Sequence, residues 1–93
     1  MRDAFAVVAN PTRRALLEML ACGEQRASDL AAPFPVSRPA IAQHLRVMVL
    51  AGVVTQRRYG RERYYTARLD PLGDIDQWLL GLTHRRAAGQ AAS

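Results

Sequence analysis

The hydrophobic pattern of this chain changes its period just after residue 52, and this change restricts the fold more than any other feature of the sequence. In residues 37–51 apolar side chains recur at spacings of four and three, as on the buried face of an α-helix. These are Ile41, Leu45 and Met48. Residues 53–69 are instead rich in β-branched and aromatic side chains around Gly60, which predicts a hairpin with strands near 53–58 and 63–69.

Start and stop signals predict the other helices. Asn10 and Pro11 are typical of a helix N-terminus, and the helix expected there, over residues 11–22, ends at Gly23. Ser28 is expected to cap a short helix, and Ser37 the helix that Gly52 closes. A short first helix is expected over residues 3–9, and a last helix in residues 70–86.

This order predicts a fold that is mainly α with a β-hairpin (α+β). Two helices joined by a tight turn and followed by a basic hairpin describe a winged helix-turn-helix, here with about five helices and a two-stranded wing. A chain of 93 residues fits one small domain. We expect that domain over residues 1–86 and a flexible C-terminal tail over residues 87–93, which carry no core-forming side chains.

The charge of the chain is concentrated in one segment. Residues 37–68 carry seven arginines and one acid, Glu62, so this segment is +6 within a chain of net charge +5. Such a distribution favours an anionic partner, although a solvated surface with chance clustering is the alternative. The sequence shows no secretory signal and no run near the about 18 apolar residues of a transmembrane helix. One cysteine excludes an internal disulfide framework and suits a reducing cytoplasm.

The helix of residues 37–51 is predicted to enter the major groove of double-stranded DNA, which admits one α-helix. Arg38 has the geometry to bind guanine and Gln43 to bind adenine, whereas Arg46 is expected at a phosphate. Ser37 caps the helix or contacts a phosphate. The hairpin arginines are expected at phosphates, with Arg61 in the minor groove, unless the hairpin is only solvated. The predicted DNA-binding residues are Ser37, Arg38, Pro39, Ala42, Gln43, Arg46, Arg57, Arg58, Arg61 and Arg63.

Several motifs stand in the order seen in ArsR-type bacterial transcriptional regulators, which the chain resembles over roughly residues 5 to 82. They are "ANPTRRALLEML", "ASDLA", "SRPAIAQHLRVM", "AGVV", "RRYGRERYY" and "DP". The resemblance implies a homodimeric winged-helix repressor that binds a palindromic operator in the bacterial cytoplasm and releases it when an effector arrives. The sequence does not identify the effector. Many members of this family bind metals. In this chain, however, Arg26 and Ser28 occupy the positions of the two cysteines of one known metal site, and "DID" (74–76) lacks the histidine of a second site. We therefore expect neither metal nor cofactor.

The last helix carries an apolar stripe that so small a fold has no obvious means to cover. The resemblance implies that the first and last helices of two subunits pack together; the alternative is that the stripe folds back onto its own domain. The predicted dimer-interface residues are Phe5, Val8, Leu72, Ile75, Trp78, Leu79 and Leu82.

Other function classes are less consistent with the sequence. A winged-helix module that binds only proteins has no need of the +6 segment, and we find no nucleophile–base pair or clustered carboxylates that would indicate an enzyme. A helix cannot enter the deep, narrow major groove of double-stranded RNA. Cys22 is expected to be a small core residue, and His44 a packing residue rather than a pH switch.

Overall fold

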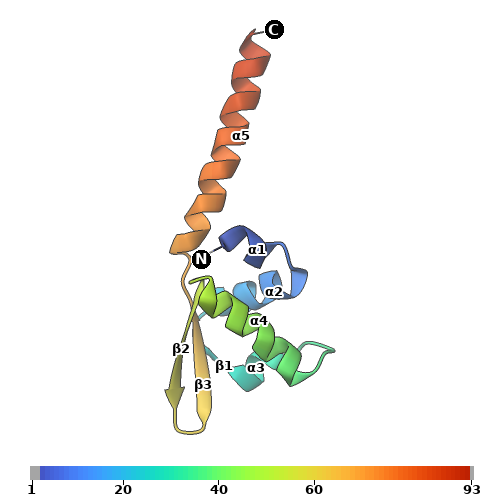
Figure 1. The fold of residues 1–93 in the computed structure, drawn as a ribbon, viewed down its shortest axis with the longest axis vertical. Helices are drawn as coiled ribbons and strands as arrows, with labels where there is room; N and C mark the ends of the chain where they lie inside the picture. Colours follow the sequence, from blue (N-terminus) through green and yellow to red (C-terminus); the bar gives the residue numbers. More distant parts are fainter. Residues whose placement is uncertain (1–2, 93) are drawn as a thin grey trace.

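A small body of four helices and a hairpin carries the last helix as a projecting rod (Figure 1). The computed structural model describes residues 3–92, and residues 90–92 by their backbone alone. The molecule extends 61 Å in one direction and 25 Å in the other two because this helix leaves the body. In chain order the elements are α1 (Ala4–Val8), α2 (Pro11–Ala21), β1 (Gln25–Arg26), α3 (Ala27–Ala31), α4 (Arg38–Leu50), β2 (Val54–Tyr59), β3 (Glu62–Ala67), the 3-10 turn η1 (Asp70–Leu72) and α5 (Gly73–Ala92).

Two of the predicted helix caps are confirmed by their hydrogen bonds. The Oδ1 atom of Asn10 accepts from the backbone N–H groups of Thr12 and Arg13 at 2.9 and 3.2 Å. The hydroxyl of Ser37 accepts from the N–H of Ala40 at 3.3 Å. In both helices a proline occupies the first turn, where its missing N–H leaves no intrahelical bond unmade. These caps fix where α2 and α4 begin.

The core lies between α2, α3, α4 and the hairpin. The predicted apolar face of α4 is confirmed, because its side chains are almost completely buried against those of α2 and the rest of the core. Each such side chain contributes about 1.5–3 kcal/mol when it leaves water. The largest fully buried side chains are Val7, Leu16, Leu30, Ile41, Leu45, Met48, Val53 and Val54. This core fixes the orientation of α4, so the opposite side of α4 has to face solvent.

The hairpin belongs to a three-stranded antiparallel sheet with the order β1-β3-β2. In β2 and β3, Gln56 pairs with Tyr65 and Arg58 pairs with Arg63 across a tight turn at Gly60, whose φ is 64°. The sequence predicted only the two strands of the wing. The third, β1, has two residues and pairs with β3 at Tyr64 and Tyr65. The helix-turn-helix of α3 and α4, followed by this sheet, is the predicted winged arrangement.

The structure also corrects several local expectations. Ser28 lies inside α3 and does not cap it, because the helix starts two residues earlier than expected, at Ala27, and Arg26 occupies the N-cap position. Cys22 is exposed, since it lies on the side of α2 opposite the buried leucines. Leu69 at the end of the predicted second strand (63–69) is exposed, because the strand alternation that buries Tyr65 ends at Ala67.

The last helix is longer than the sequence predicted. Its backbone is helical through Ala92, whereas residues 87–93 were expected to form a tail; Ser93 lies outside the described residues. Helix-favouring alanines continue the helix, although Ala87 and Ala88 are exposed. Mobility of this end in solution stays a prediction. In the described part of the chain no helix is both long and apolar enough to cross a membrane.

Candidate nucleic-acid interface

The solvent side of α4 presents the side chains that the sequence predicted to contact DNA. Its buried positions face the core, so the intervening positions point outward. Those predicted to bind DNA are all exposed, namely Ser37, Arg38, Pro39, Ala42, Gln43 and Arg46. The hydroxyl of Ser37 accepts the hydrogen bond that caps α4. A helix with an exposed arginine in its first turn and a glutamine one turn later has the side chains needed to bind base edges.

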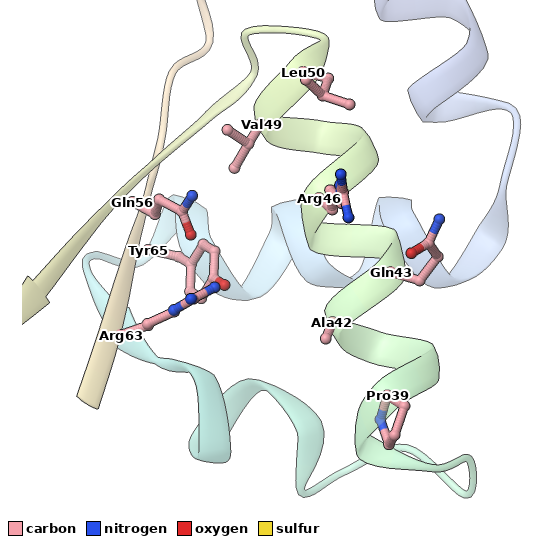
Figure 2. Close-up of a pocket in the computed structure, with 9 residues that line it drawn as sticks. All are labelled: Pro39, Ala42, Gln43, Arg46, Val49, Leu50, Gln56, Arg63 and Tyr65. Carbon is pink, nitrogen blue, oxygen red and sulfur yellow. The ribbon is translucent and has the colours of Figure 1, made fainter. Parts of the chain in front are cut away.

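An open groove of about 530 Å³ separates α4 from the wing (Figure 2). The residues that line it are Pro39, Ala42, Gln43, Arg46, Val49, Leu50, Gln56, Arg63 and Tyr65. Arg63 and Gln56 come from the wing, and Arg46 and Gln43 from α4 (Figure 2). None of these nine residues is acidic, so the groove carries guanidinium and amide groups without a compensating carboxylate. This composition suits a phosphate backbone.

A second hollow of about 350 Å³ lies at the other end of α4, against α3 and the tip of the wing. Arg38 from the first turn of α4 and Arg61 from the hairpin turn both line it, together with Glu62. The two arginines are 23 positions apart in the sequence. The fold therefore brings the predicted base-contacting arginine and the predicted minor-groove arginine to the same end of the surface.

The wing arginines lie on two different faces of the hairpin. Side chains alternate between the faces of a strand, and the buried Tyr65 marks the face toward the body and α4. Arg58 and Arg63 share that face and stand directly opposite each other in the ladder. Like charges in this position repel, and an anion between them relieves the repulsion. Arg57 lies on the opposite face, across from Tyr64.

On that opposite face Arg57 is held by the body of the protein. Its Nε and Nη2 atoms donate to the two carboxylate oxygens of Glu24, both at 2.8 Å. Its guanidinium lies 4.8 Å from the ring centre of Tyr64 and 5.9 Å from that of Tyr59. The hydroxyl of Thr66 donates to the same carboxylate at 3.3 Å. The hydrogen bonds from Arg57 lower the pKa of Glu24 below its ordinary value, and those to Glu24 raise the pKa of Arg57.

His44 joins α4 to the helices beneath it. Its Nδ1 atom accepts from the Nε of Arg13 at 3.3 Å, and another nitrogen of Arg13 donates to the carbonyl of Ala6 at 2.9 Å. His44 is half-buried, which agrees with the structural role expected from the sequence. The Arg13 side chain thus connects α1, α2 and α4.

The apolar stripe of α5 is divided between the body and solvent. Leu72 and Val8 are partly buried against the core of their own chain, and Ile75 is half-buried. Trp78 remains 54% exposed and Leu79 50%. Phe5 and Leu82 are also exposed, and the ring of Phe5 meets Trp78 edge-on at 5.7 Å between ring centres. Most of the predicted interface is therefore uncovered in a single chain.

The described residues contain no group of three or more histidine, cysteine, aspartate or glutamate side chains that would hold a metal ion. Arg26, which stands at one of the family's metal positions, is instead bonded to Asp29 through its Nε at 3.0 Å. A guanidinium repels a cation, so this end of α3 is a poor metal site.

Comparison with known proteins identifies the family of the chain that carries this surface. Residues 10–56, which include α2, α3 and α4, match the family described as bacterial regulatory protein, arsR family. The chain belongs to the arsR family. It is thus a DNA-binding transcriptional repressor of the winged helix-turn-helix class and not an enzyme, as the sequence predicted.

Individual relatives cover almost the whole chain. The transcriptional repressor SdpR of Bacillus subtilis is 33% identical over 85 residues, which are 91% of this chain and 94% of SdpR. An HTH-type transcriptional regulator of Mycobacterium tuberculosis is 42% identical over 87 residues, covering 86% of this chain and 79% of its own. The crystal structure of a possible transcriptional regulator for arsenical resistance has a TM-score of 0.80 at 45% identity, over 88% of this chain and 85% of that one. An ArsR-like regulator from Rhodococcus sp. RHA1 has a TM-score of 0.82 at 35% identity, over 95% of this chain and 81% of its own.

Sequence reasoning missed the residues that support the interface rather than form it. Glu24 is 33 positions from Arg57, and no local pattern connects the two. The alternation of side chains along the hairpin was, however, a usable signal. It places Arg57 and Arg58 on opposite faces, although both were predicted to contact phosphates.

Proposed function

We propose that the chain is a homodimeric arsR-family repressor that binds a palindromic operator through α4 and the wing. The observation that carries the proposal is the joint surface of the outward side of α4 and the groove-facing side of the hairpin. Arg38 and Arg61 lie at one end of this surface, and Gln43, Arg46 and Arg63 line its acid-free groove.

Within this proposal the two parts of the surface have different tasks. Arg38 and Gln43 bind base edges in the major groove, and Ala42 and Pro39 allow the helix backbone to approach closely. Arg46, Arg58 and Arg63 neutralise phosphates, Arg61 reaches the minor groove, and Ser37 caps α4 beside the backbone. Arg57 was predicted to act with them, but it is bonded to Glu24 on the opposite face of the hairpin.

The dimer in this proposal forms through α1 and α5. The exposed apolar side chains of Phe5, Trp78, Leu79 and Leu82 support it, because a lone chain leaves them in water. A two-fold axis between the subunits gives two recognition helices, and two such helices bind a palindrome whose half-sites are about one helical turn or a multiple apart. The repressor acts on bacterial DNA in the cytoplasm and does not respond to metal.

Selection of bound DNA from a random pool by the purified full-length protein tests this proposal. A palindromic consensus is expected. Replacement of Arg38 or Gln43 should then cost roughly 1–3 kcal/mol on that operator and relax the preference at one position per half-site. Replacement of Arg63 should weaken operator and random DNA alike. Recovery of no consensus, or of a consensus without two-fold symmetry, would contradict the proposal.

A further inference from the structure

We infer that Arg57 is a positioning residue that holds the wing, through Glu24 and Tyr64, at the angle needed for DNA, and that it is not itself a phosphate contact. The inference rests on the proposed function, because it assigns the parts of that same surface. It separates one arginine of the wing from the others by what each one touches.

The first argument is the geometry of the Arg57 side chain. Two of its nitrogen atoms already form a fork with both carboxylate oxygens of Glu24, each at 2.8 Å. The guanidinium also lies over the ring of Tyr64, with its central carbon 4.8 Å from the ring centre. To reach a phosphate on the α4 side, Arg57 would have to break both contacts and cross to the other face of the hairpin. Neither Arg58 nor Arg63 has to do so, because the ladder already places them on that face.

The second argument is charge. Glu24 neutralises Arg57, whereas Arg58, Arg61 and Arg63 form no ion pair within the described residues. A neutralised arginine offers no net charge to displace counterions from DNA, and unpaired arginines do. The four wing arginines are therefore not equivalent, although the sequence treats them as one basic cluster.

The third argument is what the contact connects. Glu24 directly precedes β1 at one edge of the sheet, Arg57 lies on β2 at the other edge, and Thr66 on the central strand β3 donates to the same carboxylate. The three side chains thus cross all three strands. Because β1 continues into α3, they tie the hairpin to the helix-turn-helix. Arg–carboxylate forks fix direction as well as distance, which a lysine does not.

The test compares matched variants at Arg57 and Arg58 in full-length protein bound to the selected operator. Affinity is measured over a range of salt concentrations. Arg58→Gln should lower the slope of log affinity against log salt by about two per dimer, since each lost phosphate contact accounts for about 0.9. Arg58→Lys should keep the slope. Arg57→Gln should lower affinity about two- to fivefold at every salt concentration without changing the slope. Arg57→Lys should lose as much as Arg57→Gln, because an ammonium cannot form the fork.

Amide hydrogen exchange of the DNA-free protein supplies a second readout. Arg57→Gln and Glu24→Gln should both accelerate exchange in β2, because each one breaks the same contact. Arg58→Gln should not, since it only removes a like-charge pair. The inference is overturned if Arg57→Gln lowers the salt slope as Arg58→Gln does, or if Arg57→Lys keeps wild-type affinity. Absence of salt-dependent DNA binding by the wild type would refute the proposed function. In that case the exchange rates by themselves would show whether Arg57 holds the wing in position.

Discussion

Replacing Trp78 and Leu79 together by alanine should convert the protein into folded monomers. Both side chains are about half exposed in the single chain, so their removal opens no cavity in the core between α2 and α4. The same exposure leaves a large apolar surface on α5 available to a second copy. A dimer that packs α5 against α5 would remove both residues of each subunit from water. The double variant would therefore lose this burial in both subunits.

The expected loss in the free energy of dimerisation follows from the exposed fraction of Trp78. A tryptophan presents up to about 250 Å², so the 54% left in water is roughly 135 Å². At about 25 cal/mol per Å² this area corresponds to about 3 kcal/mol per chain and about 6–7 kcal/mol per dimer. This is an upper limit, since alanine keeps part of the contact. With about 1.4 kcal/mol for each factor of ten, this limit for Trp78 corresponds to a loss of dimer affinity of about 10⁵-fold.

Sedimentation equilibrium measures the loss directly, and circular dichroism reports whether the helices remain. Leu80→Ala is the matched control, because Leu80 is 51% exposed on the same helix but lies on the side away from Trp78. It should leave the dimer almost unchanged. A wild-type protein that is monomeric at tens of micromolar would refute the reasoning. So would a double variant that dimerises as tightly as wild type, or one that unfolds.

Three further predictions concern the cap, the Glu24 carboxylate and metals. Ser37→Ala should lower the free energy of unfolding by about 1 kcal/mol in urea denaturation; Ser37→Asp should keep the cap but weaken DNA binding, because it adds a negative charge where phosphates are expected. Because the pKa of Glu24 is lowered in the folded protein, its pairing stabilises the fold above the ordinary value of 4.5 and is lost as pH falls through the lowered one. A carbon-13 titration of that carboxyl should show a midpoint below 4.5, and the midpoint should rise in Arg57→Gln; equal midpoints would contradict the pairing. Zinc, cadmium and arsenite should leave operator affinity unchanged in a binding assay, and a stoichiometric metal that survives dialysis and alters DNA binding would show otherwise.

The sequence was sufficient where local periodicity and capping determine structure. The spacing of Ile41, Leu45 and Met48 fixed the buried face of α4, and therefore also its outward face. Asn10 and Ser37 marked helix starts because a cap is a contact between neighbours in the chain. These local signals were enough to predict the helix-turn-helix and the hairpin.

Features that depend on distant residues could not be predicted in the same way. The strand β1 has only two residues, too few to show a period, and it forms only because β3 offers an edge. The partner of Arg57 is on another element, so the sequence showed the charge of the arginine but not its neutralisation by Glu24. The full length of α5 was missed because the exposed Ala87 and Ala88 give no apolar pattern, although alanine favours the helix.

The two-faced hairpin restricts which insertions and deletions the wing can accept. A single residue added to β2 before Arg57 would exchange the faces, turning Arg57 toward α4 and Arg58 toward Glu24, because side chains alternate with a period of two. Two added residues would keep every side chain on its own face and only lengthen the arm. Changes at the turn around Gly60 would leave the faces unchanged as well. Viable length variants of this wing should therefore differ by whole pairs of strand residues or be confined to the turn.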